Sequence, residues 1–272
     1  MSLLTAIRRF RYLFDEADYF RERYDETAID QLVVNLDAGV AASIRSGASA
    51  AVEGDAVTAF NDQTSYGHHA TQATSANMPE YLPMGIGGAT PCVSFDGLDD
   101  YLDFATGLAL TQGVDGYTII HVADLTLDGA YRQVFAVQGA TPYHERFSYF
   151  LNAYGFQQRT LLACRADSDS QATLNSTSSA IAGGFAVESI SMDFCAQTAH
   201  IYRNGVKLAE SNSLGTGSGR VSATAANKHR IGAASGGAIQ KVAQHLEIQR
   251  YVSQYEIVQH HKGLMTKWGI AW

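Results

Sequence analysis

The chain has 272 residues, of which 46% are hydrophobic and 17% charged, and its net charge is -8. This length suits one large β domain with an appendage, and the apolar share is enough for a sizeable core. The negative net charge, with Arg8, Arg9 and Arg11 as the one cationic cluster, excludes nucleic acid as a main partner. No apolar run approaches the ~20 residues that a membrane span needs, so we expect no membrane partner.

Residues 2 to about 26 are predicted to form an amphipathic helix, because large apolar side chains recur there at three- and four-residue spacing. This stripe either packs on the protein's own β domain or anchors the chain to a partner or a second copy. We favour the anchor, because the helix precedes the whole domain and carries more large apolar side chains than a cap requires. The candidate partner-binding residues are Ile7, Phe10, Leu13, Phe14 and Phe20.

The first residues do not resemble an export signal. Arg8, Arg9 and Arg11 interrupt the apolar run, and no cleavage site of small residues follows. We therefore expect a chain that is synthesised and kept in the cytoplasm. The acidic run Asp15, Glu16 and Asp18 also disfavours a helix that lies on a membrane surface.

The rest of the chain is predicted to be mostly β-strand, with turns between strands every ten or so residues. Residues 38–56 are small and rich in Gly, Ala and Ser, so we predict a loop there. The predicted strands are 32–37, 117–125, 133–138, 147–152, 160–165, 188–195, 229–232 and 242–250. This spacing is typical of a sandwich or a barrel. The predicted fold class is therefore all-β, with a helix at each end.

Three local signals are strong. The run from Val93 to Phe104 alternates apolar and polar residues around an Asp-Gly pair, which indicates a strand, a turn and a strand. Asn204-Gly205 between two alternating runs indicates a two-residue hairpin, because both central residues need a positive φ. Ser253 with Glu256 forms a capping box that begins a closing helix over 253–268, and Gly269 supplies its stop.

The cysteines Cys92, Cys164 and Cys195 are far apart and odd in number, and each lies in an apolar, strand-like run. We expect buried, reduced thiols. The spacing of Cys and His matches no zinc site, because the pairs His68-His69 and His260-His261 are adjacent rather than on one helical face. Structural histidines are the better interpretation of both pairs.

The densest acidic cluster is Asp96, Asp99, Asp100 and Asp103. Calcium requires several oxygen ligands from one loop, but an Asp-Gly pair also forms ordinary turns. Adjacent residues on a strand point to opposite faces, which disfavours joint ligation by Asp99 and Asp100. A structural turn is the first interpretation and calcium the second. No other cofactor is expected.

Catalytic patterns are missing from the sequence. A glucanase of a β-sandwich fold places two or three carboxylates on one strand face, and no E-x-D-x-x-E spacing occurs. There is no Gly-x-Ser-x-Gly elbow, and the Gly-rich stretches match neither a P-loop nor a dinucleotide turn. We therefore predict that the chain is not an enzyme.

The order of four motifs resembles the laminin-G-like and concanavalin A-like lectin and glucanase jelly rolls, which are common in bacteriophage and secreted bacterial proteins. They are Tyr66-Gly-His-His-Ala-Thr-Gln72, Phe95-Asp-Gly-Leu-Asp-Asp-Tyr-Leu102, Tyr202-Arg-Asn-Gly-Val206 with His229-Arg-Ile-Gly232, and the closing helix that ends Lys-Trp-Gly-Ile270. The resemblance implies a two-sheet antiparallel jelly roll over residues 31–272. Residues 1–30 then form a separate N-terminal helical anchor.

The resemblance together with the lack of an export signal suggests a virion structural protein that decorates a phage head or tail. Its partners would be other virion proteins or copies of itself, and surface glycans are a further candidate. A soluble bacterial carbohydrate-binding module is the first alternative. A glycan-cleaving hydrolase with divergent carboxylates is the second.

Overall fold

The computed structural model describes residues 26–125, 132–138, 145–151, 158–163, 172–176, 184–214, 226, 228–232 and 239–271. The expected N-terminal helix, with Ile7, Phe10, Leu13, Phe14 and Phe20, lies outside these residues, and so does Cys164. The anchor role and the boundary between residues 30 and 31 therefore stay predictions.

The described chain is built of β-strands with one α-helix near its end. The strands of its first half are β1 (Leu32–Asp37), β2 (Ile44–Ser46), β3 (Ser49–Ala50), β4 (Ala59–Phe60), β5 (Ala70–Thr71), β6 (Glu80–Ile86), β7 (Thr90–Asp96), β8 (Tyr101–Asp103) and β9 (Gly116–Leu125). Those of its second half are β10 (Arg132–Gln138), β11 (Glu145–Leu151), β12 (Arg159–Ala163), β13 (Ala172–Asn175), β14 (Gly184–Asp193), β15 (Thr198–Arg203), β16 (Val206–Ser211), β17 (Lys228–Gly232) and β18 (Ile239–Ile248). Helix α2 spans Gln254–Trp268, and short 3-10 turns are η1 (Glu26–Ala28), η2 (Ala41–Ser43), η3 (Ser75–Asn77) and η4 (Ala105–Gly107).

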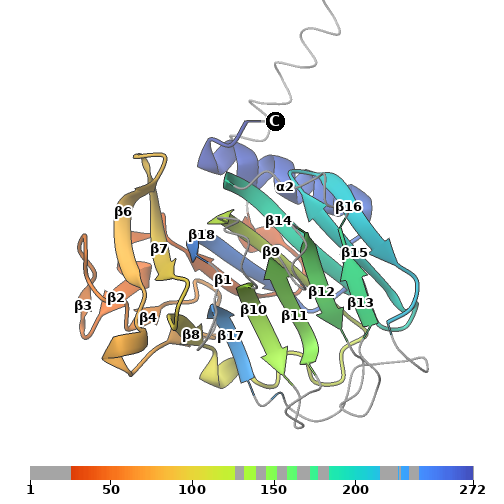
Figure 1. Ribbon diagram of the computed structural model, residues 1–272, viewed down its shortest axis with the longest axis horizontal. Helices are drawn as coiled ribbons and strands as arrows, with labels where there is room; N and C mark the ends of the chain where they lie inside the picture. Colours follow the sequence, from red (N-terminus) through yellow and green to blue (C-terminus); the bar gives the residue numbers. More distant parts are fainter. Residues whose placement is uncertain are drawn as a thin grey trace, which may run out of the picture.

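Two antiparallel sheets form a sandwich (Figure 1). The eight-stranded sheet has the order β16-β15-β14-β9-β18-β7-β6, and β1 also pairs with β18. The ten-stranded sheet has the order β13-β12-β11-β10-β17-β8-β5-β4-β2-β3. Strands distant in sequence are thus neighbours, as when β18 pairs with β9, β7 and β1. The all-β prediction of two packed antiparallel sheets with a closing helix is confirmed.

The main core lies between the sheets, and strand alternation decides which side chains enter it. On β14, Ile190 and Met192 point into this core, whereas Ser189 and Ser191 point to the opposite face. There Ser189 Oγ contacts His261 of α2 at 2.8 Å. The eight-stranded sheet is therefore buried on both faces, by the ten-stranded sheet on one side and by α2 on the other.

Helix α2 begins and ends as its sequence predicts. The Ser253 side chain accepts from the Glu256 backbone N–H while the Glu256 side chain accepts from that of Ser253, and Gly269 ends the helix with a φ of 67°. Ile257, Leu264 and Met265 pack in a second core with residues from β9 and β18. No helix among the described residues has both the length and the apolar character of a membrane span.

Two sequence-based expectations are corrected, and one strand was missed. The predicted loop 38–56 contains the short strands β2 and β3, which pair with each other through Arg45 and Ala50. Strand β6 was not predicted, because Pro83 and Gly85 interrupt its sequence. Its pairing with β7 is irregular. Cys195 is exposed rather than buried, because β14 ends at Asp193 and the residue lies in the following turn. Cys92 is buried, as expected.

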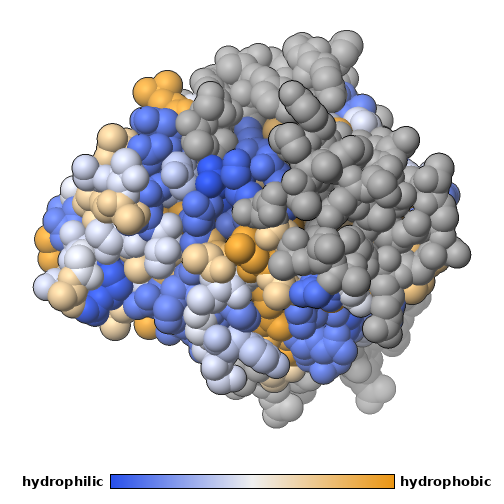
Figure 2. Space-filling model, turned by 90° about the horizontal axis from the view of Figure 1, so that it is seen from below, coloured by the Kyte–Doolittle hydropathy of each residue, from blue (hydrophilic) through white to orange (hydrophobic). Residues whose placement is uncertain are grey.

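Few large hydrophobic side chains of the described residues are exposed. They are Val40, Val52, Tyr66, Met84, Leu98, Val206 and Tyr255, which come from different elements. Figure 2 shows a narrow hydrophobic strip bordered by hydrophilic residues on the described part of one face. Single exposed apolar residues are ordinary, so attention falls on the one that sits beside a pocket, Tyr66.

Candidate functional site

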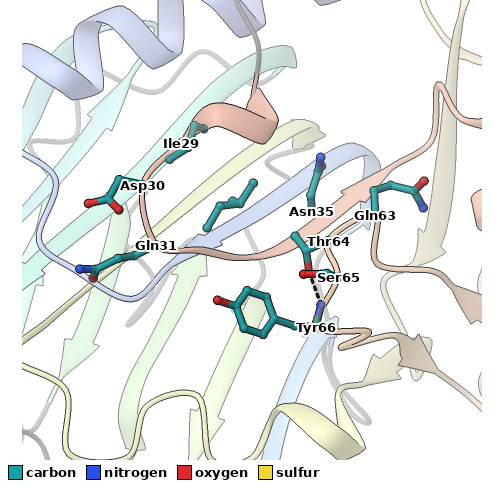
Figure 3. A pocket seen from close by; sticks show the side chains of 9 residues that line it. Ile29, Asp30, Gln31, Asn35, Gln63, Thr64, Ser65 and Tyr66 are labelled. Carbon is teal, nitrogen blue, oxygen red and sulfur yellow. Dashed lines mark hydrogen bonds between the residues drawn. The ribbon is translucent and has the colours of Figure 1, made fainter.

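A polar pocket lies where the chain enters β1. Its volume is about 400 Å³, and we call it the Tyr66 pocket. Residues 29–32 and Asn35 form one wall, and the loop 63–66 forms the other (Figure 3). Its lining residues are Ile29, Asp30, Gln31, Leu32, Asn35, Gln63, Thr64, Ser65 and Tyr66. The volume lies within the usual ~300–1,000 Å³ range of small-molecule sites.

The buried carboxylate of Asp62 holds the loop wall in place. Its Oδ1 accepts from the backbone N–H of Asn35 at 2.8 Å and of Thr64 at 2.9 Å. Its Oδ2 accepts from the Thr64 hydroxyl at 2.6 Å and from the His68 N–H at 2.9 Å. The bond to Thr64 N is the local turn that Asp favours, and the bond to Asn35 ties the turn to β1. The pocket wall is therefore braced before any ligand arrives.

Tyr66 stands at the mouth of the pocket and is 61% exposed. Its ring is stacked on that of His68, with centroids 6.0 Å apart and planes at 6°. Gly67 between them has a φ of 68°, a conformation that other residues adopt rarely. An exposed ring held in one orientation is a flat apolar platform with a hydroxyl at its edge.

The pocket presents amide, hydroxyl and carboxylate groups. Asn35 is 2% exposed, its Oδ1 accepts from Gln244 Nε2 at 2.9 Å, and its Nδ2 donates to no described residue. The exposed side chains of Gln31, Gln63 and Ser65 also line it. Such groups both donate and accept hydrogen bonds. The pocket wall therefore offers both donors and acceptors to a polar ligand.

Two buried carboxylates lie elsewhere, on the inner face of the eight-stranded sheet. Glu188 accepts from Arg159 Nε at 2.9 and 2.8 Å and from Tyr149 OH at 2.6 Å, and Arg203 also donates to it. Burial acts to raise the pKa of Glu188, but the charges and hydrogen bonds of Arg159 and Arg203 outweigh it and lower this pKa to about 2.

Glu247 is held by histidines instead. Its Oε1 lies 2.8 Å from His229 Nε2 and 2.8 Å from His245 Nε2, and Tyr117 OH donates to its other oxygen. Burial acts to raise its pKa, but the His229 charge and these hydrogen bonds hold it well below its usual value. Glu188 and Glu247 are 2% and 0% exposed, sealed between the sheets. A glycosidase carboxylate must reach its substrate, so we read this pair as structural.

The acidic turn after β7 brings three carboxylates together. Those of Asp96, Asp99 and Asp100 lie within 4.8 Å of one another, so the expectation that Asp99 and Asp100 diverge is wrong, because both lie in the turn and not on a strand. Asp96 Oδ1 accepts from Leu98 N at 2.8 Å, and Asp100 Oδ2 accepts from Asp96 N at 2.9 Å. Burial raises the pKa of Asp100 to about 6, and the charges of Asp96 and Asp99 act in the same direction. These bonds account for the turn, and calcium stays the second interpretation.

Asp103 does not join that turn. Its carboxylate pairs with Arg230 on β17, with Nε–Oδ1 at 2.8 Å and Nη2–Oδ2 at 3.0 Å. The guanidinium also lies 4.0 Å from the centre of the Tyr101 ring. Both contacts join β8 to β17.

The predicted structural histidines are found in structural roles. His261 is buried, accepts from Gly205 N at 2.8 Å and contacts Ser189, so it joins α2 to the β15–β16 hairpin. His69 Nδ1 accepts from Asp62 N at 3.0 Å within the pocket loop. The Tyr66 pocket itself was not predicted. The available signal was a tyrosine amid Asp, Gln, Thr, Ser and Gly, a turn composition that tends to expose an aromatic ring.

Comparison with known proteins defines the fold. No model of a known family matches the sequence, and no curated protein matches it. Trypanosoma rangeli sialidase, in complex with 2,3-difluoro-KDN, matches 87% of this chain and 33% of its own, with a TM-score of 0.53 and 15% identity. A mutant of that enzyme displaying trans-sialidase activity matches with a TM-score of 0.52 and 13% identity. The CBM40 of Ruminococcus gnavus IT-sialidase matches 61% of this chain and 94% of its own length, with a TM-score of 0.49 and 13% identity.

This chain thus spans about a third of the length of the trypanosomal enzyme. At such identities the likeness establishes a shared β-sandwich, jelly-roll-like fold.

Proposed function

We propose that this protein is a non-catalytic glycan-binding β-sandwich and that the Tyr66 pocket holds the sugar. The observation that carries the proposal is the exposed Tyr66 ring at the mouth of a pocket whose wall contains the Asn35 amide. A sugar ring has apolar C–H faces and polar hydroxyl edges. An aromatic platform suits the faces, and amides and carboxylates suit the hydroxyls.

The bracing by Asp62 supports the same proposal. Binding costs less when the groups that contact a ligand are already ordered. Here Asp62 accepts four hydrogen bonds that tie the loop wall to β1 and to itself. The fold shared with part of a sialidase is compatible with glycan binding. Among the functions that the sequence left open, this proposal favours a carbohydrate-binding module over a virion structural protein.

A particle role is kept as a prediction from the sequence. Location in a virion and attachment through residues 1–30 rest on the motif order and on the apolar stripe, and a glycan-binding pocket is compatible with both. Fractionation of particles from the source organism, followed by detection of this chain, tests that prediction.

A glycan array probed with the purified protein, followed by calorimetry on the best ligand, tests the proposal. We expect Tyr66→Ala to reduce affinity by about tenfold, since an aromatic contact contributes ~0.5–1.5 kcal/mol and 1.4 kcal/mol is tenfold. The control is Tyr255→Ala, because Tyr255 is 75% exposed and lines no part of the pocket. The proposal fails if no glycan binds, or if both variants bind like the parent protein.

The divergent-hydrolase alternative is tested on the same ligands. We expect the purified protein to release no reducing sugar from a glycan that it binds. Release that a single Asp or Glu substitution abolishes would show instead that the chain is an enzyme.

A further inference from the structure

A second pocket adjoins the Tyr66 pocket, and we call it the Tyr251 pocket. Its volume is about 460 Å³. The residues just before β9, the end of β14 and the segment after β18 line it, so it lies at the end of the eight-stranded sheet. Its lining residues are Gln31, Gly113, Val114, Asp115, Gly116, Asp193, Cys195, Gln249, Arg250 and Tyr251.

The two pockets meet at the segment before β1. Gln31 lines both of them and is exposed. Its backbone oxygen accepts from Gln249 N at 3.0 Å, which joins a wall of one pocket to a wall of the other. Arg250 of the Tyr251 pocket reaches Asp30 of the Tyr66 pocket, with Nε 3.4 Å from the backbone oxygen and 3.7 Å from Oδ2. Each pocket is large enough for a small ligand by itself.

The charge of the combined lining is negative. Asp30, Asp115 and Asp193 contribute carboxylates, and Arg250 is the one cation among the lining residues. Arg250 is already paired, because its Nη2 lies 2.9 Å from Glu256 Oε1 in addition to its contact with Asp30. A ligand with a carboxylate would meet like charges here, whereas an uncharged or cationic sugar would not.

The Tyr251 pocket also offers an aromatic side chain and a hydrogen-bond acceptor. Asp193 Oδ1 accepts from Ala196 N at 2.8 Å. Its Oδ2 accepts from no described residue and can accept from a ligand. Tyr251 is half-buried, and its hydroxyl donates to no described residue. Each pocket is thus lined by a tyrosine and at least one carboxylate, and Gln31 lines both.

We infer that the Tyr66 and Tyr251 pockets form one cleft that binds an oligosaccharide of neutral or amino sugars, with Gln31 between two sugar subsites. This inference rests on the proposed glycan binding and adds the length and the charge of the ligand. It runs against binding of sialic acids, which carry a carboxylate.

The length of the ligand is tested by calorimetry with N-acetylglucosamine, its tetramer, the deacetylated tetramer and 3'-sialyllactose. We expect both tetramers to bind at least about tenfold more tightly than the monosaccharide, as a second aromatic subsite would provide. Tyr251→Ala should bring tetramer affinity down toward that of the monosaccharide and leave the monosaccharide affinity unchanged. Tyr251→Phe keeps the ring and should retain most of the tetramer affinity, and Tyr255→Ala is the matched control.

The charge preference is tested with Asp193→Asn, which keeps the acceptor for Ala196 N. We expect this variant to lose part of the preference for the deacetylated over the acetylated tetramer. Melting temperatures of all variants verify that they are folded.

The outcomes separate the two ideas. If no sugar binds, the proposed function itself fails. If sugars bind and Tyr66→Ala weakens them, but the tetramers gain nothing over the monosaccharide or Tyr251→Ala has no effect, only the two-subsite cleft is overturned. Tighter binding of 3'-sialyllactose than of either tetramer overturns the charge preference.

Discussion

Glu188 and Glu247 lie on the inner face of the same sheet and are equally buried, yet their partners differ in kind. Glu188 is paired with Arg159 and Arg203, whose guanidinium groups keep their charge at any pH a protein meets. Glu247 is paired with His229 and His245, and imidazole, unlike guanidinium, has a neutral form near neutral pH. Two equally buried carboxylates can therefore differ in how much stability is lost when their pairing is broken. When the carboxylate is removed, a partner that can lose its proton need not remain as an unpaired buried charge.

The largest effect is expected from Glu188→Gln. The substitution keeps the volume but leaves Arg159, which is 0% exposed, without its counter-charge. Breaking a buried pair in this way costs ~3–5 kcal/mol of unfolding free energy. Urea denaturation measures it, and Glu210→Gln in the exposed pair with Lys207 is the control, for which we expect no measurable change. A loss no greater than that of the control would contradict a structural role for Glu188.

Glu247→Gln should cost less, about 1–3 kcal/mol, because the histidines can become neutral and the glutamine amide still offers an acceptor. The same urea experiment measures it at pH 7. An equal or greater loss than for Glu188→Gln would mean that the histidine partners adapt no better than the arginines do.

Acid should destabilise the fold through buried histidines that are not paired with Glu247. Burial lowers the pKa of His121 to about 3, and the neighbouring His245 adds to the shift. Burial also lowers the pKa values of His260 and His261, to about 4 and about 3. The unfolded chain then binds more protons than the folded one below pH ~6.5, so stability falls as pH drops from there.

Two other shifts set the remaining shape of the pH profile. The pKa of Glu188 is lowered, so its contribution is present above its unfolded pKa and is lost as pH falls toward about 2. Burial acts to lower the pKa of His229, but Glu247 raises it above its usual value. His229 therefore favours the folded state as pH falls, opposite to His121, His260 and His261. Melting temperatures from pH 8 to 4 test the balance. His121→Gln should flatten the decline below pH 6.5, and an unchanged slope would be inconsistent with a buried neutral His121.

The smallest effect is expected at Asp100, a carboxylate that pairs with no cation among the described residues. The pKa of Asp100 is raised to about 6 by burial, with the charges of Asp96 and Asp99 in the same sense. A carboxyl group whose pKa is raised in the folded state makes the protein less stable as pH rises through that range. Asp100→Asn should therefore raise the melting temperature at pH 8 by about 2 °C, and not at pH 4. Bound calcium would reverse the sign at pH 8, because the substitution would remove a ligand.

Local signals were sufficient where short-range chemistry decides the structure. Asn204 and Gly205 have φ values of 46° and 78°, as the two-residue hairpin requires, and the turn is closed by Arg203 opposite Val206. The capping box and Gly269 gave the closing helix to within one residue. Each depends on a few neighbouring residues whose backbone geometry permits few alternatives.

Prediction failed where a residue's role depends on distant partners. Strands β2 to β5 are only two or three residues long and exist because they pair with one another and with β8. Asp96, Asp99 and Asp100 converge because the turn is not a strand. The Tyr66 pocket needs β1, the residues before it and a loop about thirty residues later.

Alternation of apolar and polar residues, the Asn-Gly turn and the helix caps were enough to predict an all-β sandwich or barrel with a closing helix, and the motif order favoured the sandwich. These patterns act over a few residues, so they can be read without knowing the neighbours. Which polar groups contact one another depends instead on how the two sheets pack. This packing pairs Arg159 with Glu188 and His229 with Glu247, and it lets Asp62 accept from the Asn35 backbone N–H. Those contacts join strands that are far apart in sequence, and their geometry is set by sheet packing.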